Sequence, residues 1–179
     1  MDTFHLRIFQ RHVRDQCQFL IQSAHQLNAG LTQHNISQVL FAIQNLLNAG
    51  ANVSKMLWGA RGKKSQERKP LRDSIGISDN SPLREVTMRN HFEHIDERID
   101  RWWAESESHN HADGIIGPRN TIAGLEPIET FRWFDPATAE IVFWGESFNI
   151  QALVSEAERI LPRLQEEAGK PHWEEPDLR

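Results

Sequence analysis

Residues 4 to 28 read FHLRIFQRHVRDQCQFLIQSAHQLN, and this stretch points to a helical fold. Apolar residues recur along it at steps of three and four, which predicts one long amphipathic helix. Cys17 belongs to the apolar stripe, so we expect it to serve packing. Asn28-Ala29-Gly30 then offers a stop, because glycine suits the left-handed residue that follows a helix end. The stripe consists of Leu6, Phe9, Val13, Cys17, Leu20, Ala24 and Leu27.

A second helix is predicted from Ile36. Its apolar residues continue to Leu47, and Asn48-Ala49-Gly50 repeats the earlier stop signal. Two outcomes fit this pattern. The helix either ends there, with Asn52 capping a short new helix to Leu57, or it bends and continues.

Two more helices follow along the chain. Ser81-Pro82 predicts a helix start, because serine caps helices well and proline suits the first turn. This third helix should run to about Glu105. Asn149 caps a fourth helix, which Pro162 should kink or shorten. The buried stripe expected for the third helix is Met88, Phe92, Ile95, Ile99 and Trp102.

One segment is typical of sheet. Residues 131 to 144 hold two aromatic and β-branched runs around Asp135-Pro136, which predicts a β-hairpin that covers helices or a partner. Residues 59 to 80 and 106 to 129 are rich in turn residues and predict two long loops, the first with room for one turn of helix around Leu71 to Ile75. We therefore expect an all-α fold, an up-down helical bundle of four main helices with a small β-hairpin, as a single domain over residues 1 to 179.

The composition is that of a globular chain. Of its 179 residues 39% are hydrophobic and 25% are charged, which is enough to build a core. The sequence has neither an apolar run of about 18 residues nor a signal peptide, so we expect a cytoplasmic protein without membrane contact. Its single cysteine excludes an internal disulfide and a cysteine-rich zinc site.

The net charge of −5 argues against a nucleic-acid footprint over the whole surface but allows a local one. Basic residues gather in the loop 59 to 80, whereas the tail 169 to 179 is acidic. The loop is either a solvated segment or a site that contacts RNA phosphates. The RNA contacts expected are Arg61, Lys63, Lys64, Arg68 and Lys69.

The third helix contains the motif Arg89-Asn90-His91-Phe92-Glu93-His94. An arginine, a polar residue, a short spacer and a histidine resemble the active-site motif of the HEPN superfamily, small helical-bundle domains of bacterial toxins, defence systems and RNA-processing enzymes. The resemblance implies a metal-independent endoribonuclease without cofactor, acting as a toxin or defence effector, with a possible antitoxin. Its catalytic residues would be Arg89, Asn90 and His94. Asp96 stands where many toxin members have a tyrosine.

These residue types suit RNA cleavage. The 2′-hydroxyl is the nucleophile, so the site needs proton-transfer groups, a role that His94 suits, and a cation for the phosphate, such as Arg89. On a straight helix the two side chains project about 140° apart. We therefore expect a homodimer with the third helix near its two-fold axis, because such a dimer brings the arginines and histidines of both copies into one cleft.

Three other readings of these residues remain open. The helix surface with Asn90, His94, Glu97 and Arg101 is also typical of a solvated face, which would make the chain a catalytically inactive helical-bundle protein-interaction module. Histidines near the motif allow a metal site, although we expect no metal; its ligands would be His91, His94, His109, His111 and Asp113. Four tryptophans allow a base-stacking platform, although core packing is the preferred interpretation. They are Trp102, Trp103, Trp133 and Trp144.

Overall fold

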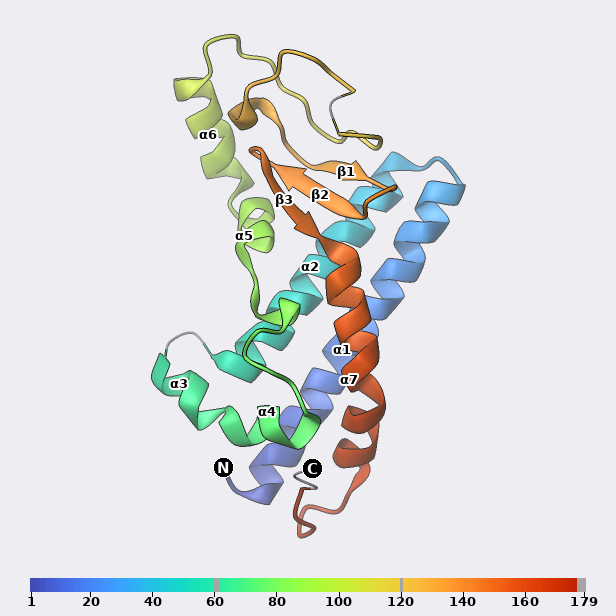
Figure 1. Ribbon diagram of the computed structural model, residues 1–179, viewed down its shortest axis with the longest axis vertical. Coiled ribbons are helices and arrows are strands. Elements are labelled where there is room, and N and C mark those ends of the chain that lie inside the picture. The colour runs from blue at the N-terminus through green and yellow to red at the C-terminus, as the bar shows by residue number, and fades with distance from the viewer. Residues whose placement is uncertain (60–61, 120, 177–179) are drawn as a thin grey trace.

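The computed structural model describes residues 1–59, 62–119 and 121–176 (Figure 1). The chain is mostly helical, as predicted, with a small antiparallel sheet. In chain order the elements are α1 (Thr3–Thr32), α2 (Ile36–Trp58), α3 (Gly62–Glu67), α4 (Lys69–Ile75), the 3-10 helix η1 (Pro82–Arg84), α5 (Thr87–Glu93), α6 (Ile95–Glu105), the 3-10 helix η2 (Pro127–Glu129), β1 (Trp133–Asp135), β2 (Glu140–Phe143), β3 (Glu146–Asn149) and α7 (Ile150–Gly169).

Three long helices form the frame. α2 returns antiparallel beside α1, and α7 packs along α1 (Figure 1). Asp2 and Asn35 start α1 and α2 by accepting hydrogen bonds from the backbone N–H groups of His5 and Gln38. Within the described ranges, no helix is long and apolar enough to cross a membrane.

The glycine stop predicted for the first helix was wrong, and of the two outcomes left open for the second helix the structure shows that it continues. α1 continues past Gly30, and α2 continues through Gly50. A Cβ atom on Gly30 would lie 3.0 Å from the backbone nitrogen of Val39, and one on Gly50 would lie 2.7 Å from Cδ2 of Leu153. The missing side chains therefore let neighbouring backbone and side chains approach closely, so these glycines serve packing and not helix termination.

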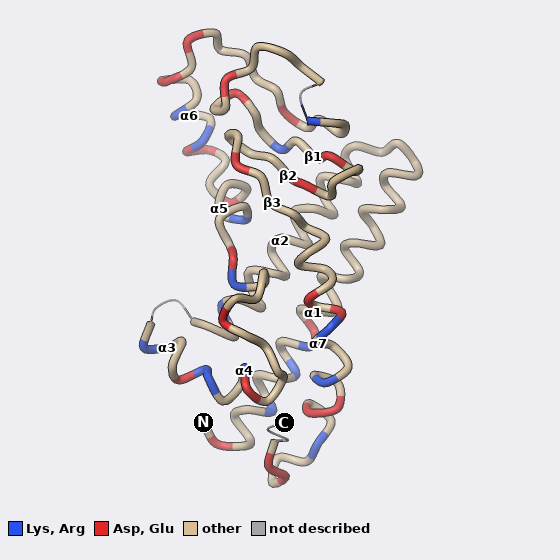
Figure 2. The backbone as a smooth tube through the Cα atoms, viewed as in Figure 1, with Lys and Arg blue, Asp and Glu red and all other residues tan. Residues whose placement is uncertain are grey.

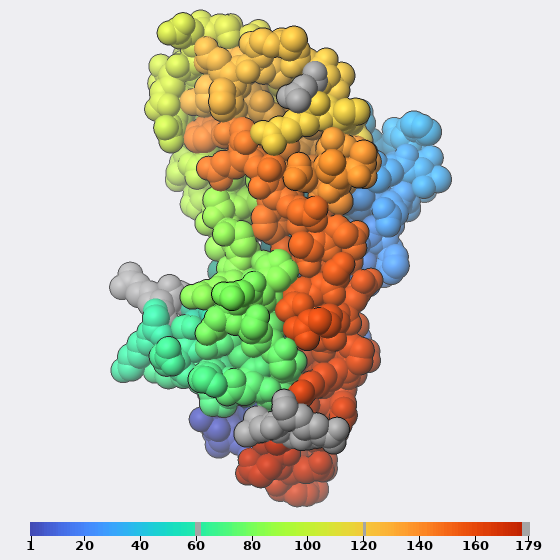
Figure 3. Space-filling model, in the orientation of Figure 1, coloured from blue at the N-terminus to red at the C-terminus, as the bar shows by residue number. Residues whose placement is uncertain are grey.

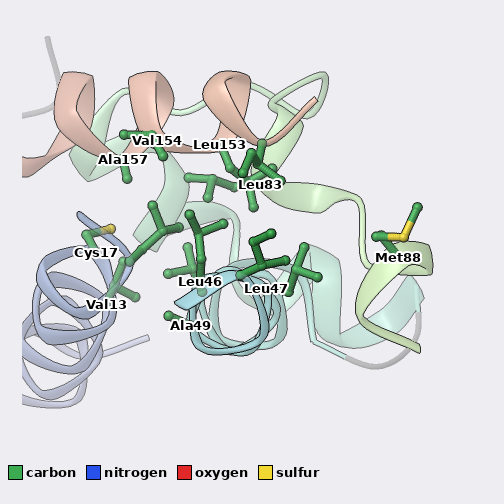
Figure 4. Close-up of a cluster of buried hydrophobic side chains, with 14 of the residues drawn as sticks. Val13, Cys17, Leu46, Leu47, Ala49, Leu83, Met88, Leu153, Val154 and Ala157 are labelled. Carbon is green, nitrogen blue, oxygen red and sulfur yellow. The ribbon is translucent and has the colours of Figure 1, made fainter. Parts of the chain in front are cut away.

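The core lies among α1, α2 and α7. Cys17 is fully buried in it, which confirms its predicted packing role. Burial, together with the charge of Glu156, raises the pKa of the Cys17 thiol to about 12. Figure 4 shows one cluster of this core, with Val13 and Cys17 from α1, Leu46, Leu47 and Ala49 from α2, and Leu153, Val154 and Ala157 from α7.

The predicted continuous third helix was wrong. The segment forms η1, α5 and α6, and the helix breaks at His94, whose φ and ψ are −104° and 36°. Met88 and Phe92 on α5 are buried as expected, whereas Ile99 on α6 is exposed. Because of the break, α5 packs on the core while α6 runs in a different direction. On α6, Trp102 Nε1 donates a hydrogen bond to the carbonyl of Asn110 in the segment that follows the helix.

The predicted hairpin is confirmed and gains a third strand. β1, β2 and β3 pair antiparallel in chain order, with Trp133 opposite Val142. Phe134 and Ile141 join the core that the helices share, so the sheet covers helices as the hairpin required. β3 has no counterpart in the prediction, because residues 146 to 149 lack an alternating apolar pattern.

Two other expectations need correction. The predicted loop 59 to 80 contains α3 and α4. The turn of helix expected around Leu71 to Ile75 is part of α4, which Pro70 and Gly76 start and end, whereas α3 was not predicted. α7 runs through Pro162 to Gly169, so the predicted shortening was wrong. Pro162 lies on the exposed side of α7, where water can bond the carbonyl that proline leaves unpaired.

Candidate functional site

Arg89 lies on α5 with its side chain turned into the protein. It is buried, and its Nη1 atom donates to the carboxylate of Glu93, one turn further along, and to Asn90 Oδ1 at 3.3 Å. The structure therefore brings Arg89 and Asn90, two of the three predicted catalytic residues, into contact with one another. The guanidinium charge, however, is already paired with a carboxylate.

His94 lies at the break between α5 and α6 and points outward. Half of its side chain is exposed, and Nδ1 is 3.3 Å from Glu97 Oε1. Its carbonyl accepts the first backbone hydrogen bond of α6, from Arg98. Among the described residues, no hydrogen bond or ion pair joins His94 to Arg89, so one copy of the chain does not assemble the predicted catalytic set.

The charge around this break is negative. Residues 87 to 105 carry three arginines against five carboxylates. Two of the arginines, Arg98 and Arg101, lie over the ring of Trp144, and Arg101 also pairs with Glu105 at 2.8 Å. An RNA phosphate would therefore meet a surface on which carboxylates outnumber cations.

His91 is the organised histidine of this region. It is buried, stacks on Phe143 with ring centroids 4.8 Å apart, and accepts at Nδ1 from Arg98 Nε at 3.2 Å. Because Nδ1 accepts, the proton sits on Nε2, which lies 3.3 Å from Glu146 Oε2. His91 thus ties α5 and α6 to β3, a packing role that its sequence neighbours do not indicate.

The predicted basic cluster is divided among separate contacts. Lys64 pairs with Glu67 at 2.6 Å, and Lys69 pairs with Asp73. Arg68 lies 3.8 Å above the ring of Phe9. Lys63 is exposed and has no ion-pair partner within the described part of the chain, whereas Arg61 falls outside the described residues. Figure 2 shows these charges on α3 and α4, at the opposite end of the molecule from α6.

Some of the tryptophans and histidines proposed as alternative sites are engaged in packing. Trp133 is buried and donates to the Gly117 carbonyl, and His111 packs between Trp102 and Phe131. Trp103, however, is 66% exposed. Among the residues that the structure describes, no group of three or more histidine, cysteine or carboxylate side chains could hold a metal ion.

A second surface of the protein, on α1 and α2, is unusual because it lacks charged residues. Between Asp15 and Lys55 there is no aspartate, glutamate, lysine or arginine, although a quarter of the whole sequence is charged. This stretch forms most of the α1–α2 hairpin, and Figure 2 shows that part of both helices without charged residues. In Figure 3 the tip of the hairpin projects from the side of the molecule.

The outer side of this hairpin holds a shallow groove of about 330 Å³ between α1 and α2. Phe19 lines the groove and is 56% exposed, and Phe41, one turn before Asn45 on α2, is 61% exposed. Asn52 Nδ2 donates to Gln16 Oε1 across the groove at 3.2 Å. We call this surface the neutral face; it consists of Gln16, Phe19, Gln22, Ser23, Gln26, Phe41, Asn45, Asn48, Ala49 and Asn52.

The helix spacing explains how the neutral face forms. Phe41, Asn45, Asn48 and Asn52 follow one another at steps of three and four, so they share one side of α2 while the buried stripe occupies the other. The apolar periodicity of the sequence does not reveal this surface. Its signal is the absence of charge on the polar side of two amphipathic helices.

Comparison of the chain with known protein families, with curated proteins and with solved structures found no match.

Proposed function

We propose that this protein is a helical protein-interaction module and that the neutral face is its binding surface. The observation that carries the proposal is the lack of charge between Asp15 and Lys55 on two largely exposed helix faces. Solvated helix faces normally carry charged residues, whereas the centres of protein interfaces are depleted in charge and enriched in aromatic residues. Phe19 and Phe41 supply the aromatic residues.

The amides of the neutral face suit a binding role. Each glutamine or asparagine side chain can both donate and accept hydrogen bonds, so a partner can pair with it without burying an uncompensated charge. Two exposed phenylalanine rings provide apolar anchors of the kind that dominate binding energy when a partner covers them. The long helices hold these groups on a rigid support.

The size of the assembly in cells tests this function. Tagged wild-type chain, expressed in its native host and gently extracted, should migrate well above its own 20.7 kDa. Phe41→Glu would bury a charge without a partner in the contact and should return the chain to monomer size. Trp103→Glu, at an equally exposed aromatic residue on α6, is the matched control and should behave like the wild type.

Two results would overturn the proposal. One is a wild-type chain that migrates as a monomer in the extract. The other is a Phe41→Glu chain that keeps the wild-type size while remaining folded by circular dichroism. Because Phe41 is largely exposed, its replacement should leave the fold intact.

The second candidate function is the HEPN-type endoribonuclease. The observation in its favour is the exposed imidazole of His94 at a helix break, followed on α6 by Arg98 and Arg101 at steps of four and three. In a homodimer that juxtaposes two such breaks, the two histidines would move protons and the arginines would bind phosphate. As a toxin or defence effector, such a dimer could be held inactive by an antitoxin.

Labelled RNA tests this candidate. In the presence of EDTA the wild type should produce fragments ending in 2′,3′-cyclic phosphate, and His94→Ala should abolish cleavage with the fold intact. Replacing Lys63, Lys64 and Arg68 together should reduce the salt dependence of RNA binding by about 0.7 log unit for each phosphate that the variant no longer binds. Intact RNA after incubation with the wild type would contradict the candidate.

A further inference from the structure

We infer that the partner of the neutral face is a second copy of this chain, related by a two-fold axis that passes through the groove between α1 and α2. The inference rests on the proposed function and names its partner. It differs from the dimer expected from sequence, which places the third helix at the axis. Charge, hydrogen-bonding chemistry, shape and contact area all favour this partner.

Charge favours a second copy at this surface. Each chain carries a net charge of −5, so two copies repel one another across most pairs of facing surfaces. On the neutral face that repulsion is weakest, since the nearest residues of either sign along the chain, Asp15 and Lys55, flank the stretch that forms it. A strongly basic partner would gain nothing from this face and would be attracted elsewhere.

The chemistry of the neutral face is self-complementary. A two-fold axis brings the same patch of both copies together, so each group must be able to pair with a group of its own kind. Carboxylates and ammonium groups fail this condition, whereas glutamine and asparagine meet it because they carry both a donor and an acceptor. Asn52 and Gln16 already form one such amide pair within the chain, at 3.2 Å.

The shape of the neutral face also fits. α1 and α2 are antiparallel, so a two-fold axis perpendicular to them stacks one hairpin on the other and makes a four-helix layer between the copies. In that arrangement Phe41 of each copy can enter the groove of the other, which has a volume of about 330 Å³ and contains Phe19. Both exposed rings would then be covered.

The contact area is sufficient for a specific dimer if it includes the neutral face and the uncharged residues that continue both helices toward the tip of the hairpin. The uncharged parts of α1 and α2 are each about 25 Å long at the standard rise, and two helices side by side are about 20 Å wide. The contact would bury about 500 Å² on each copy, or about 1,000 Å² in total, the lower limit of specific interfaces. We therefore expect a reversible dimer at micromolar concentrations.

Sedimentation equilibrium of the purified chain tests the inference. The wild type should sediment with twice its mass of 20.7 kDa. Phe41→Glu and, separately, Asn45→Glu should weaken the dimer at least about 100-fold, because each introduces a pair of like charges beside the axis. Phe41→Leu should retain the dimer, and Trp103→Glu is the control outside the neutral face.

The outcomes separate this inference from the function on which it rests. A purified wild type that is monomeric, together with an assembly in extracts that Phe41→Glu dissolves, would overturn the second copy and leave the interaction module standing. A monomer both in extracts and after purification would overturn both. A dimer that tolerates both glutamate variants would show that the copies meet elsewhere, and would also overturn the inference.

Discussion

Arg7 Nη1 lies 2.8 Å from Glu167 Oε2, and each of these side chains is only 1% exposed. The pair joins the first turns of α1 to the last turns of α7, residues that lie near opposite ends of the chain. The same guanidinium donates to Gln10 Oε1 at 2.7 Å and to the Glu174 carbonyl at 2.7 Å. Arg7 therefore connects both ends of the chain at one end of the helical frame.

Replacing Arg7 should lower the free energy of unfolding of the protein. Arg7→Met removes the guanidinium from the buried Glu167 carboxylate, which keeps Lys170 Nζ at 2.5 Å. Because the carboxylate keeps a partner, we expect a cost of about 1.5–3 kcal/mol, that of losing hydrogen bonds to a charged group, and not the full cost of an unpaired buried charge. The exposed pair of Arg14 with Asp15 provides the control, for which Arg14→Met should cost less than about 1 kcal/mol. Urea unfolding measures both. Equal losses of unfolding free energy in the two variants would show that the buried contacts of Arg7 do not stabilise the fold more than an exposed ion pair does.

Gly50→Ala should also destabilise the protein. The added Cβ would lie 2.7 Å from Leu153 Cδ2 in the buried contact between α2 and α7. Overpacking of this kind costs about 1–3 kcal/mol, which exceeds the gain of about 1 kcal/mol that alanine brings to a helix. At Gly169 a Cβ would meet no atom within 4 Å, so Gly169→Ala should leave the melting temperature unchanged or raise it. A Gly50→Ala protein as stable as Gly169→Ala would contradict this account.

Glu129 should make stability depend on pH in acid. Burial alone would raise its pKa, but hydrogen bonds from Ser108, the Glu126 amide, Ser106 and the Asn110 amide outweigh burial and lower the pKa to about 2, from 4.5. A lowered pKa contributes stability that is complete above pH 4.5 and is lost as the pH falls toward 2. Glu129→Gln should therefore cost about 1–3 kcal/mol near pH 7.

The thermal stability of the wild type and Glu129→Gln should converge as the pH falls from 4.5 toward 2. Glu158→Gln, at an exposed position on α7, is the control and should follow the wild type throughout. A difference between the wild type and Glu129→Gln that stays constant over this range would show that the carboxylate is not held ionised by its donors.

Local sequence patterns predicted much of the helical frame. The apolar stripes of α1 and α2 and the cap Asn149 of α7 depend on residues a few positions apart, and the structure confirms these helices. Gly30 gave a wrong helix end, and Gly50 left the end of the second helix undecided, because both glycines serve close packing, against Val39 and Leu153, which no local pattern reveals. No local pattern reveals the pair of Arg7 with Glu167 either, because the two residues lie far apart in the sequence.

The candidate site was harder to predict. Arg89 and Asn90 are in contact, but the helix break at His94 depends on α5 and α6 having different packing partners, which the sequence pattern does not reveal. His91 gains its role from Phe143 and Glu146 on strands far along the chain. The neutral face could have been found from the sequence, because a count of charges along the chain exposes the gap between Asp15 and Lys55.

Photo-crosslinking from Phe41 tests the central claim most directly. The chain is produced in its host with the photoreactive residue p-benzoylphenylalanine in place of Phe41 or, as the control, in place of Trp103. Irradiation should give a discrete adduct from position 41 at twice the mass of the chain, and none from position 103, since only the neutral face is covered in the assembly. No adduct from position 41, or equal adducts from both positions, would contradict the claim that the neutral face is the surface through which this protein binds.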